Sequence, residues 1–184
     1  MSPVLSTARL SLRRPVPADI GAILAIHRDP VACAHNPGDM LATRAEAEER
    51  YHRWDEHWRR HGFGYWTVRF HADEDGGALG FCGIKLMRLA DREVLNLFYR
   101  LDPVAWGDGV ATEAATSVVS WALTNRPAYP VIARVRPDNV ASARVAARAG
   151  LRRAVHLDTM GEDGLDWIFE TRWCAGPNER RHDR

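Results

Sequence analysis

A glycine-spaced turn between a strand-like segment and a long amphipathic helix is the feature that most limits how this chain folds. The segment from Val94 to Leu101 leads into Trp106-Gly107-Asp108-Gly109-Val110-Ala111-Thr112-Glu113-Ala114. Two glycines let the backbone approach a bulky anion, and the first N–H groups of the helix, at the positive end of its dipole, supply donors. The run therefore predicts a phosphate site at a helix N-terminus, although a plain tight connection has the same pattern.

The rest of the chain predicts a mixed α+β fold. Apolar residues alternate with polar ones in some segments and recur every three or four residues in others, as in strands and helices respectively. Strands are expected near residues 10–12, 65–70, 78–87, 94–101, 131–135, 152–159 and 166–173, and helices near 17–28, 43–61, 109–125 and 139–149. Strands that alternate with helices in this way predict a mixed sheet with helices on both faces.

An aromatic stripe is expected on the second helix. Thr43 and Glu46 fit a capping box, and the helix that they start carries Ala47, Tyr51, Trp54 and Trp58 on one face. The stripe is interpreted as core or groove lining, and a ligand-binding wall is the alternative.

Composition sets wider limits. The 184 residues are 46% hydrophobic and carry a formal net charge of +1, which suits one buried domain and gives no electrostatic footprint for nucleic acid. We expect a single domain over residues 1–174 and a flexible polar tail over 175–184. The cysteines Cys33, Cys82 and Cys174 are too far apart for a zinc site or a disulfide framework, so no metal is expected. With no leader and no run of 18 apolar residues, we expect a soluble cytoplasmic protein, away from membranes.

Several motifs together resemble one family. They are Thr7-Ala8-Arg9-Leu10-Ser11-Leu12-Arg13, then Tyr99-Arg100-Leu101-Asp102-Pro103 before the glycine turn, and Asn139-Val140-Ala141-Ser142 leading to Ala149-Gly150-Leu151. From Thr7 to Trp173 this order is similar to the GNAT N-acetyltransferase superfamily, in particular its RimJ/RimL-like branch of ribosomal-protein N-terminal acetyltransferases. The resemblance implies a GNAT-like, mostly antiparallel sheet of about seven strands with a splayed central pair, flanked by about four helices.

The resemblance also implies a cofactor and its binding residues. Acetyl-CoA would place its pyrophosphate on the turn from Trp106 to Thr112 and its pantetheine arm between the strand Asn96–Leu101 and its splayed partner Val131–Val135. The expected cofactor-binding residues are Leu97, Phe98, Tyr99, Leu101, Trp106, Gly107, Asp108, Gly109, Val110, Ala111, Thr112, Asn139 and Ser142. A strand N–H near Leu97 or Phe98 would donate to the developing oxyanion.

Three positions depart from the family pattern. Asn96 stands where many relatives have a glutamate that acts as a base, and an asparagine cannot take a proton; we expect it to orient a water or the acceptor amine. Glu93 has the right chemistry, but an odd spacing along a strand puts it on the other face unless a bulge intervenes. It is either a base or an ordinary surface carboxylate.

The other two departures concern the thiolate and the phosphates. Ala146 stands where many relatives have a tyrosine that protonates the leaving thiolate, and Ser142 is the expected substitute, with a purely structural helix serine as the alternative. Asp108 replaces a basic residue beside the pyrophosphate and would oppose the polyanion modestly.

The expected activity is transfer of an acetyl group to a primary amine, by direct attack in a ternary complex. No histidine or cysteine has a sequence neighbour that would activate it as a nucleophile, and His27, His52 and His57 are expected to be partly exposed packing residues. The protein is expected to be a monomer or homodimer. The acceptor is expected to be a protein N-terminus or a small amine, selected by the loop from Val31 to Ala42 together with the last two strands. In this loop Asp39 is either an ammonium partner or a solvated acid. The alternative function is a catalytically degenerate acyl-CoA sensor or scaffold.

Overall fold

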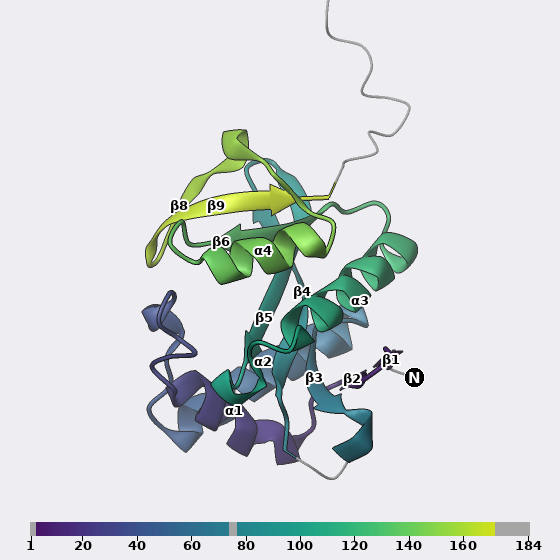
Figure 1. Ribbon diagram of the computed structural model, residues 1–184, viewed down its shortest axis with the longest axis vertical. Helices are drawn as coiled ribbons and strands as arrows, with labels where there is room; N and C mark the ends of the chain where they lie inside the picture. Colours follow the sequence, from purple (N-terminus) through teal and green to yellow (C-terminus); the bar gives the residue numbers. More distant parts are fainter. Residues whose placement is uncertain (1–2, 74–76, 172–184) are drawn as a thin grey trace, which may run out of the picture.

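The fold is a nine-stranded sheet with four α-helices (Figure 1). The computed structural model describes residues 3–73 and 77–171. The strands are β1 (Leu5–Ser6), β2 (Leu10–Arg13), β3 (Tyr65–Phe70), β4 (Gly80–Leu89), β5 (Arg92–Leu101), β6 (Val131–Val135), β7 (Arg152–Arg153), β8 (Thr159–Gly161) and β9 (Gly164–Glu170). The helices are α1 (Ile20–Arg28), α2 (Arg44–His61), α3 (Val110–Asn125) and α4 (Val140–Arg148). The strand order β1-β2-β3-β4-β5-β6-β9-β7, with β8 beside β9, confirms the expected mixed fold.

The sheet divides at its one parallel pair within the described chain. Strand β5 pairs with β6 only at Leu95↔Val131, Asn96↔Ile132 and Leu97↔Ala133. On its other edge β5 pairs with β4 along its whole length, from Arg92 to Leu101. The carboxyl half of β5 therefore leaves β6 while it stays on β4, which confirms the splayed central pair.

Two layers of helix cover the sheet because its strands alternate their side chains between the faces. On one face, Leu95 and Leu97 of β5 join the main apolar cluster with the small inner residues of α3, such as Ala114 and Ala115. On the other face, Phe98 packs with residues of α1 and α2. Figure 1 shows α3 and α4 close to the two sides of the split. Helices thus cover both faces of the sheet at the split.

Local sequence signals place the ends of the helices. The Thr43 hydroxyl accepts from the Glu46 N–H at 3.3 Å, and the Glu46 carboxylate accepts from the Thr43 N–H at 2.9 Å, so the capping box is confirmed. α2 ends at Gly62, with a φ of 75°. Of the stripe that follows Thr43, Ala47, Tyr51 and Trp58 are buried, which supports core packing over a ligand-binding wall.

The prediction of one continuous strand over 152–159 is wrong. It is broken into β7 and β8 by a 3-10 turn over Val155–Leu157. Side chains hold this turn: the Arg153 guanidinium donates to both oxygens of Asp158, and that carboxylate accepts from the Ile168 N–H at 3.0 Å. Short pieces such as β1, β7 and β8 explain why nine strands stand where about seven were expected, because two or three residues are too few for a periodic pattern.

Some sequence expectations lie outside the described residues, namely Cys174 and the tail over 175–184. No helix in the described part of the chain is long and apolar enough to span a membrane.

Candidate active site at the split between two strands

The split exposes backbone donors of β5. The Leu95 N–H donates to the Pro130 carbonyl at 2.9 Å, beside β6, and the Asp102 N–H donates to the Leu79 carbonyl at 2.8 Å on the β4 side. Since N–H directions alternate along a strand, the N–H groups of Leu97, Tyr99 and Leu101 point toward β6. The N–H of Phe98 points toward β4. Pairing ends at Leu97, so Tyr99 offers the first N–H beyond the ladder. The oxyanion donor expected near Leu97 or Phe98 lies beside this N–H.

A cavity of about 150 Å³ lies at this point. It brings together residues from separate elements: Asn36, Asn96, Leu97, Phe98, Tyr99, Ala133, Arg134, Ser142 and Asp166. Both residues expected to take part in catalysis, Asn96 and Ser142, line it. The cavity therefore joins the α3 and α4 side of the sheet to the α1 and α2 side.

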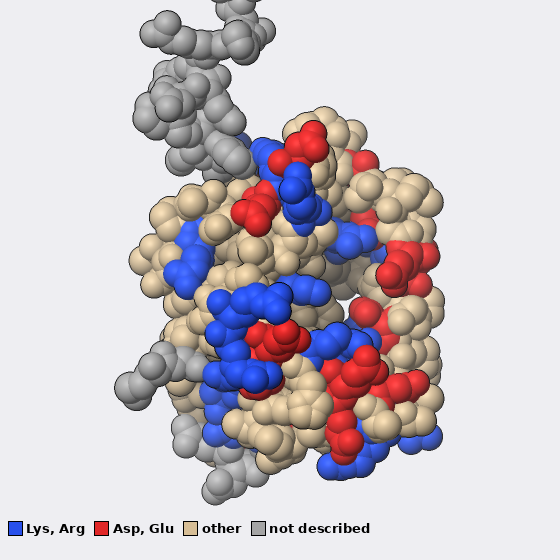
Figure 2. Space-filling model, turned by 180° about the vertical axis from the view of Figure 1, so that it is seen from behind, with Lys and Arg blue, Asp and Glu red and all other residues tan. Residues whose placement is uncertain are grey.

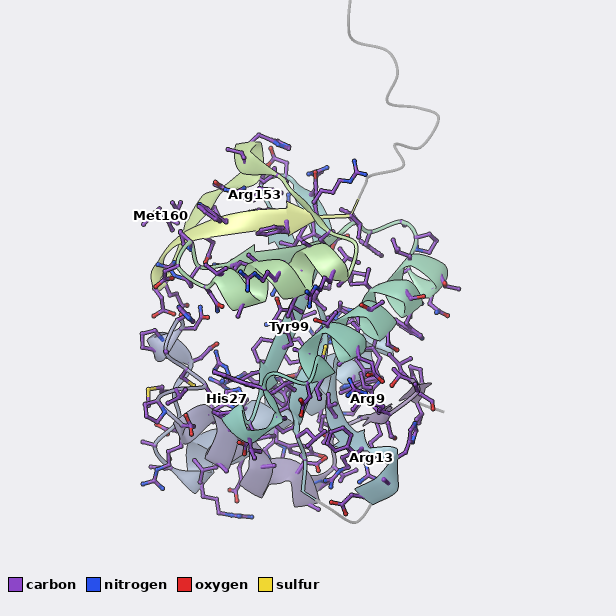
Figure 3. The ribbon with its side chains drawn as sticks, in the orientation of Figure 1. Arg9, Arg13, His27, Tyr99, Arg153 and Met160 are labelled. Carbon is purple, nitrogen blue, oxygen red and sulfur yellow. The ribbon has the colours of Figure 1, made fainter. Side chains whose placement is uncertain are left out.

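The side chain of Tyr99 reaches α4. Its hydroxyl lies 2.7 Å from Ser142 Oγ and donates to the Ser142 carbonyl at 2.8 Å. Figure 3 shows Tyr99 in the middle of the molecule, below α4. Burial raises the pKa of the Tyr99 hydroxyl, and the hydrogen bond with Ser142 opposes this. A neutral pair of hydroxyl groups thus lies at the cavity.

Asn96 is on the opposite face of β5 from Tyr99. Its Oδ1 is buried and has no hydrogen-bond partner, an arrangement that is costly unless a ligand or water satisfies it. Glu93 is exposed, and the β4–β5 register runs without interruption from Arg92 to Leu101. No bulge turns Glu93 toward the cavity, so it is a surface carboxylate.

The glycine turn lies between a 3-10 turn over Pro103–Ala105 and α3. Gly107 and Gly109 have φ values of 93° and 76°, which other residues rarely adopt. The first bond within the helix runs from Glu113 N–H to the Gly109 carbonyl at 3.0 Å. The N–H groups of Val110, Ala111 and Thr112 consequently have no partner within α3. Asp108 is exposed, as are Trp106 and both glycines.

Arg9 holds this turn in place. Its Nη2 donates to the Asp108 carbonyl at 3.0 Å, and its Nε donates to Glu113 Oε2 at 2.7 Å. Burial raises the pKa of the Glu113 carboxyl, but hydrogen bonds from Thr7 and Arg9 outweigh this and the net shift is downward. Arg9 therefore places a positive charge beside a turn whose own side chain, Asp108, is negative.

The other expected cofactor residues have structural roles as well. Asn139 Oδ1 accepts from the Ser142 N–H at 2.9 Å and so caps α4. The Trp106 indole donates to the Leu101 carbonyl at 3.1 Å. The side chains of Leu97, Leu101 and Val110 are buried, so any part that these residues play in binding comes from their backbone.

His27 lies behind Phe98, which lines the cavity. It is fully buried, not partly exposed as expected. Its Nδ1–H donates to the Ile23 carbonyl at 2.9 Å, while Nε2 is buried without a partner. Its ring stacks on Phe98 with centroids 6.4 Å apart. Burial, and then the charges of Arg100 and Arg50, lower its pKa to about 3. His27 is therefore a neutral wall residue.

The loop after α1 bridges to the other half of the molecule. The Gly38 N–H donates to Asp163 Oδ1 at 3.1 Å, and His35 Nδ1 lies 3.3 Å from Asp138 Oδ1. Asp39 lies 3.0 Å from Arg100 Nη2 and 3.9 Å from Arg50 Nη1. It is the counter-ion of two arginines, which replaces both earlier interpretations of Asp39.

Sequence reasoning missed the charged groups of the site, Arg134, Asp166, Arg100 and Arg50. Strand parity puts Arg100 on the Asn96 face and would have drawn attention to it. The pairing of Arg134 with Asp166 had no such signal.

Cys33 and Cys82 are buried, and burial raises the pKa of both thiols. Over residues 3–73 and 77–171, no cluster of three metal-ligating side chains occurs.

Comparison with known proteins gives a family match and similarity to curated relatives. Residues 9–152 match the family described as "Acetyltransferase (GNAT) domain". One of these relatives is "Uncharacterized protein YkkB" of Bacillus subtilis (strain 168), which is 33% identical over 76 residues, or 41% of this chain and 44% of the relative. The match thus spans less than half the length of that relative.

Solved structures share the fold. An acetyltransferase from Agrobacterium tumefaciens str. C58 is 25% identical with a TM-score of 0.77, over 92% of this chain and 94% of its own. RimL, a ribosomal L7/L12 alpha-N-protein acetyltransferase in complex with coenzyme A, is 13% identical with a TM-score of 0.73, over 91% and 97%. The protein yncA from Salmonella typhimurium, with acetyl-CoA, is 16% identical with a TM-score of 0.69, over 91% and 96%.

Proposed function

Because the chain belongs to the GNAT acetyltransferase family, we propose that it transfers the acetyl group of acetyl-CoA to a primary amine. The observation that carries this proposal is the cavity at the split, where Asn96, Tyr99 and Ser142 meet. Acetyl-CoA supplies an activated thioester, and the amine attacks it directly while both are bound.

The residues present suit this cosubstrate. Past Leu97, β5 has no strand partner on its β6 edge, so this edge is open to an extended pantetheine amide chain. The glycine turn offers the N–H groups of residues 110–112 and room at Gly107, where an added Cβ would meet nothing within 4 Å. Solved relatives that hold coenzyme A or acetyl-CoA support the same assignment.

Three polar groups at the cavity then have roles in the reaction. The Tyr99 N–H donates to the carbonyl oxygen of the acetyl group, where negative charge develops. The Tyr99 hydroxyl, 2.7 Å from Ser142 Oγ, then donates to that oxygen, so the Ser142 hydroxyl is free to donate its own proton to the departing sulfur. The Asn96 Oδ1, which lacks a partner, accepts from the attacking amine or from a water that removes its proton.

Direct attack is favoured over a covalent acyl-enzyme. The described residues that line the cavity include no cysteine, histidine or lysine. Cys82 is fully buried, and burial raises its thiol pKa, which leaves it without the thiolate that a nucleophile needs. The amine's proton passes to water or to the departing sulfur, and the carbon–sulfur bond breaks as the carbon–nitrogen bond forms.

The proposed acceptor is an amine at a peptide N-terminus or on a small molecule; RimL, which shares the fold, is described as an alpha-N-protein acetyltransferase. The proposal is tested by incubating the protein with acetyl-CoA and an amine panel that includes free amino acids, peptides and polyamines. Release of free thiol, with an acceptor product heavier by one acetyl group, is expected. Tight binding of acetyl-CoA with no thiol release above buffer would overturn the proposal in favour of a sensor.

A further inference from the structure

Basic side chains lie on two sides of the cavity, one of them in its lining. On the β6 and β9 wall, Arg134 lines the cavity and donates from Nε and Nη2 to Asp166 Oδ2 at 2.9 and 2.6 Å. Arg136 Nη1 lies 3.5 Å from Asp166 Oδ1, and the side chains of Arg136 and Asp166 are 15% and 7% exposed. Two guanidinium groups therefore share one buried carboxylate.

The opposite wall repeats this imbalance. Arg100 and Arg50 share Asp39, and the Arg100 side chain is only 6% exposed whereas Asp39 is 45% exposed. Arg100 Nη1 is buried without a hydrogen-bond partner. The Arg100 guanidinium lies 5.6 Å from the ring centroid of Phe98, which lines the cavity. The second arginine pair thus lies directly behind the cavity wall.

The charges do not balance. Four guanidinium groups face two carboxylates, Asp39 and Asp166. Nearby Asp138 is 78% exposed, so solvent screens its charge. Asp163 accepts from the Gly38 N–H. Figure 2 shows a hollow on the far side of the view in Figure 1, with both basic and acidic side chains around it. Buried positive charge of this kind is stabilised by an anionic group from a ligand.

We propose, building on the proposed acetyl transfer, that the acceptor is a free α-amino acid whose carboxylate is held by Arg134. Arg134 lines the same cavity as Asn96 and Ser142, so the anionic group that it binds must be close to the reacting amine. A carboxylate on the α-carbon meets this condition. Arg100 and Arg50 add to the positive field from the other wall, which disfavours polycationic acceptors.

A peptide N-terminus fits this site less well. It presents a neutral amide where the free amino acid presents a carboxylate, and a charge-assisted hydrogen bond is about twice as strong as a neutral one. The same amine on the two kinds of acceptor therefore gives different rates, and this difference measures the contribution of the arginines.

The experiment compares matched acceptors. The twenty free amino acids are assayed with acetyl-CoA, and each that reacts is compared with its carboxamide, with its decarboxylated amine and with a short peptide that begins with it. We expect kcat/KM for the free amino acid to exceed the other three by about tenfold or more. Equal or faster acetylation of the carboxamide, the amine or the peptide would overturn the inference while leaving acetyl transfer established.

Two variants test the arginines. Arg134→Gln should bring the ratio of kcat/KM for acid over carboxamide close to one, and Arg100→Gln should reduce it several-fold. The ratio is measured within one preparation, so partial unfolding does not change it. Arg60→Gln is the control, because its side chain is 69% exposed on α2 and pairs with Glu56; the ratio should stay unchanged. An unchanged ratio in Arg134→Gln would contradict the assignment.

A binding measurement separates the two proposals. If no amine reacts, acetyl transfer is wrong, and thermal unfolding with coenzyme A plus each amino acid or its carboxamide decides the inference. Stabilisation by an amino acid and not by its carboxamide supports the carboxylate site. Equal stabilisation by both, or by neither, overturns it.

Discussion

At the scale of single residues, the site has two polar sets: a pair of hydroxyl groups and one amide. The hydroxyl oxygens of Tyr99 and Ser142 lie 2.7 Å apart, so the position of each hydroxyl depends on the other. Asn96 lies across β5 from this pair with Oδ1 unpartnered. The two polar sets lie on opposite faces of one strand, and the cavity at the split connects them.

Ser142→Ala should lower kcat by about ten- to a hundredfold with little change in acetyl-CoA affinity, because its contact with sulfur strengthens only in the transition state. Steady-state kinetics and calorimetry measure the two quantities. Ser120→Ala, at an exposed position of α3, is the control and should leave both unchanged. An unaltered kcat in Ser142→Ala would reduce Ser142 to a packing residue.

Asn96→Glu should preserve or raise the rate and move its pH optimum downward. A carboxylate accepts the amine proton at lower pH than solvent allows, whereas the amide only orients it. Asn96→Gln has the same length without the charge, so it separates the effect of size from the effect of basicity. The rate is measured across pH for all three proteins, and an inactive Asn96→Glu would indicate a site built around a neutral amide.

At the scale of elements, the start of α3 combines three features that suit a pyrophosphate. The turn has two glycines at positive φ, the first N–H groups of α3 are unpaired within the helix, and Arg9 fixes the Asp108 carbonyl. Figure 3 shows Arg9 near α3, on the side of the N-terminal strands. Arg9 is paired with Glu113, so its guanidinium holds the turn while Glu113 balances its charge.

Gly109→Val should weaken acetyl-CoA binding strongly while the domain stays folded. An added Cβ would meet only Arg9 Nη2 at 3.9 Å, so the cost comes from the φ of 76° and not from a clash. Calorimetry measures the affinity, and circular dichroism checks the fold. The control is Gly21→Ala, where an added Cβ meets nothing within 4 Å. Unchanged affinity in a folded Gly109→Val protein would remove the pyrophosphate from this turn.

At the scale of the whole molecule, the loop after α1 joins the two halves that lie on either side of the split. The Gly38–Asp163 and His35–Asp138 contacts link the loop after α1 to the β8–β9 turn and to the start of α4. Behind this loop His27 is fully buried among aromatic rings. Its protonation state therefore affects the stability of the whole fold.

The folded protein should lose stability in mild acid. The pKa of His27 is lowered from 6.5 to about 3, so below pH 6.5 the unfolded state binds a proton that the folded state refuses. Stability from this group is complete above pH 6.5 and declines toward pH 3 by about 1.4 kcal/mol per pH unit. His57 adds to the decline, because burial lowers its pKa too.

Urea unfolding at a series of pH values tests this expectation. His27→Phe, which keeps an aromatic ring at the position, should give a shallower decline below pH 6.5. His52→Gln is the control, since His52 is exposed, and its decline should match the wild type. A decline in His27→Phe as steep as in the wild type would place the acid sensitivity elsewhere.

The sequence by itself determined the local elements and the turn that starts α3. The capping box at Thr43, the end of α2 at Gly62 and the strand Val131–Val135 depend on residues close together in the chain, and such interactions leave periodic or capping patterns. Asn96 and Ser142 were found by resemblance, and their shared cavity agrees with it. The break in the segment 152–159 was not predicted, because Arg153, Asp158 and Ile168 make it through side chains.

Only the tertiary structure decided which groups meet at the site. Asn36, Arg134 and Asp166 come to the cavity from a loop, β6 and β9, elements that are brought together by strand pairing and helix packing over long separations. Strand alternation predicts the face on which each residue lies, but it does not predict the partner across the gap. The Tyr99–Ser142 pair and the shared carboxylates of the arginines depend on that partner, so no local pattern in the sequence contained them.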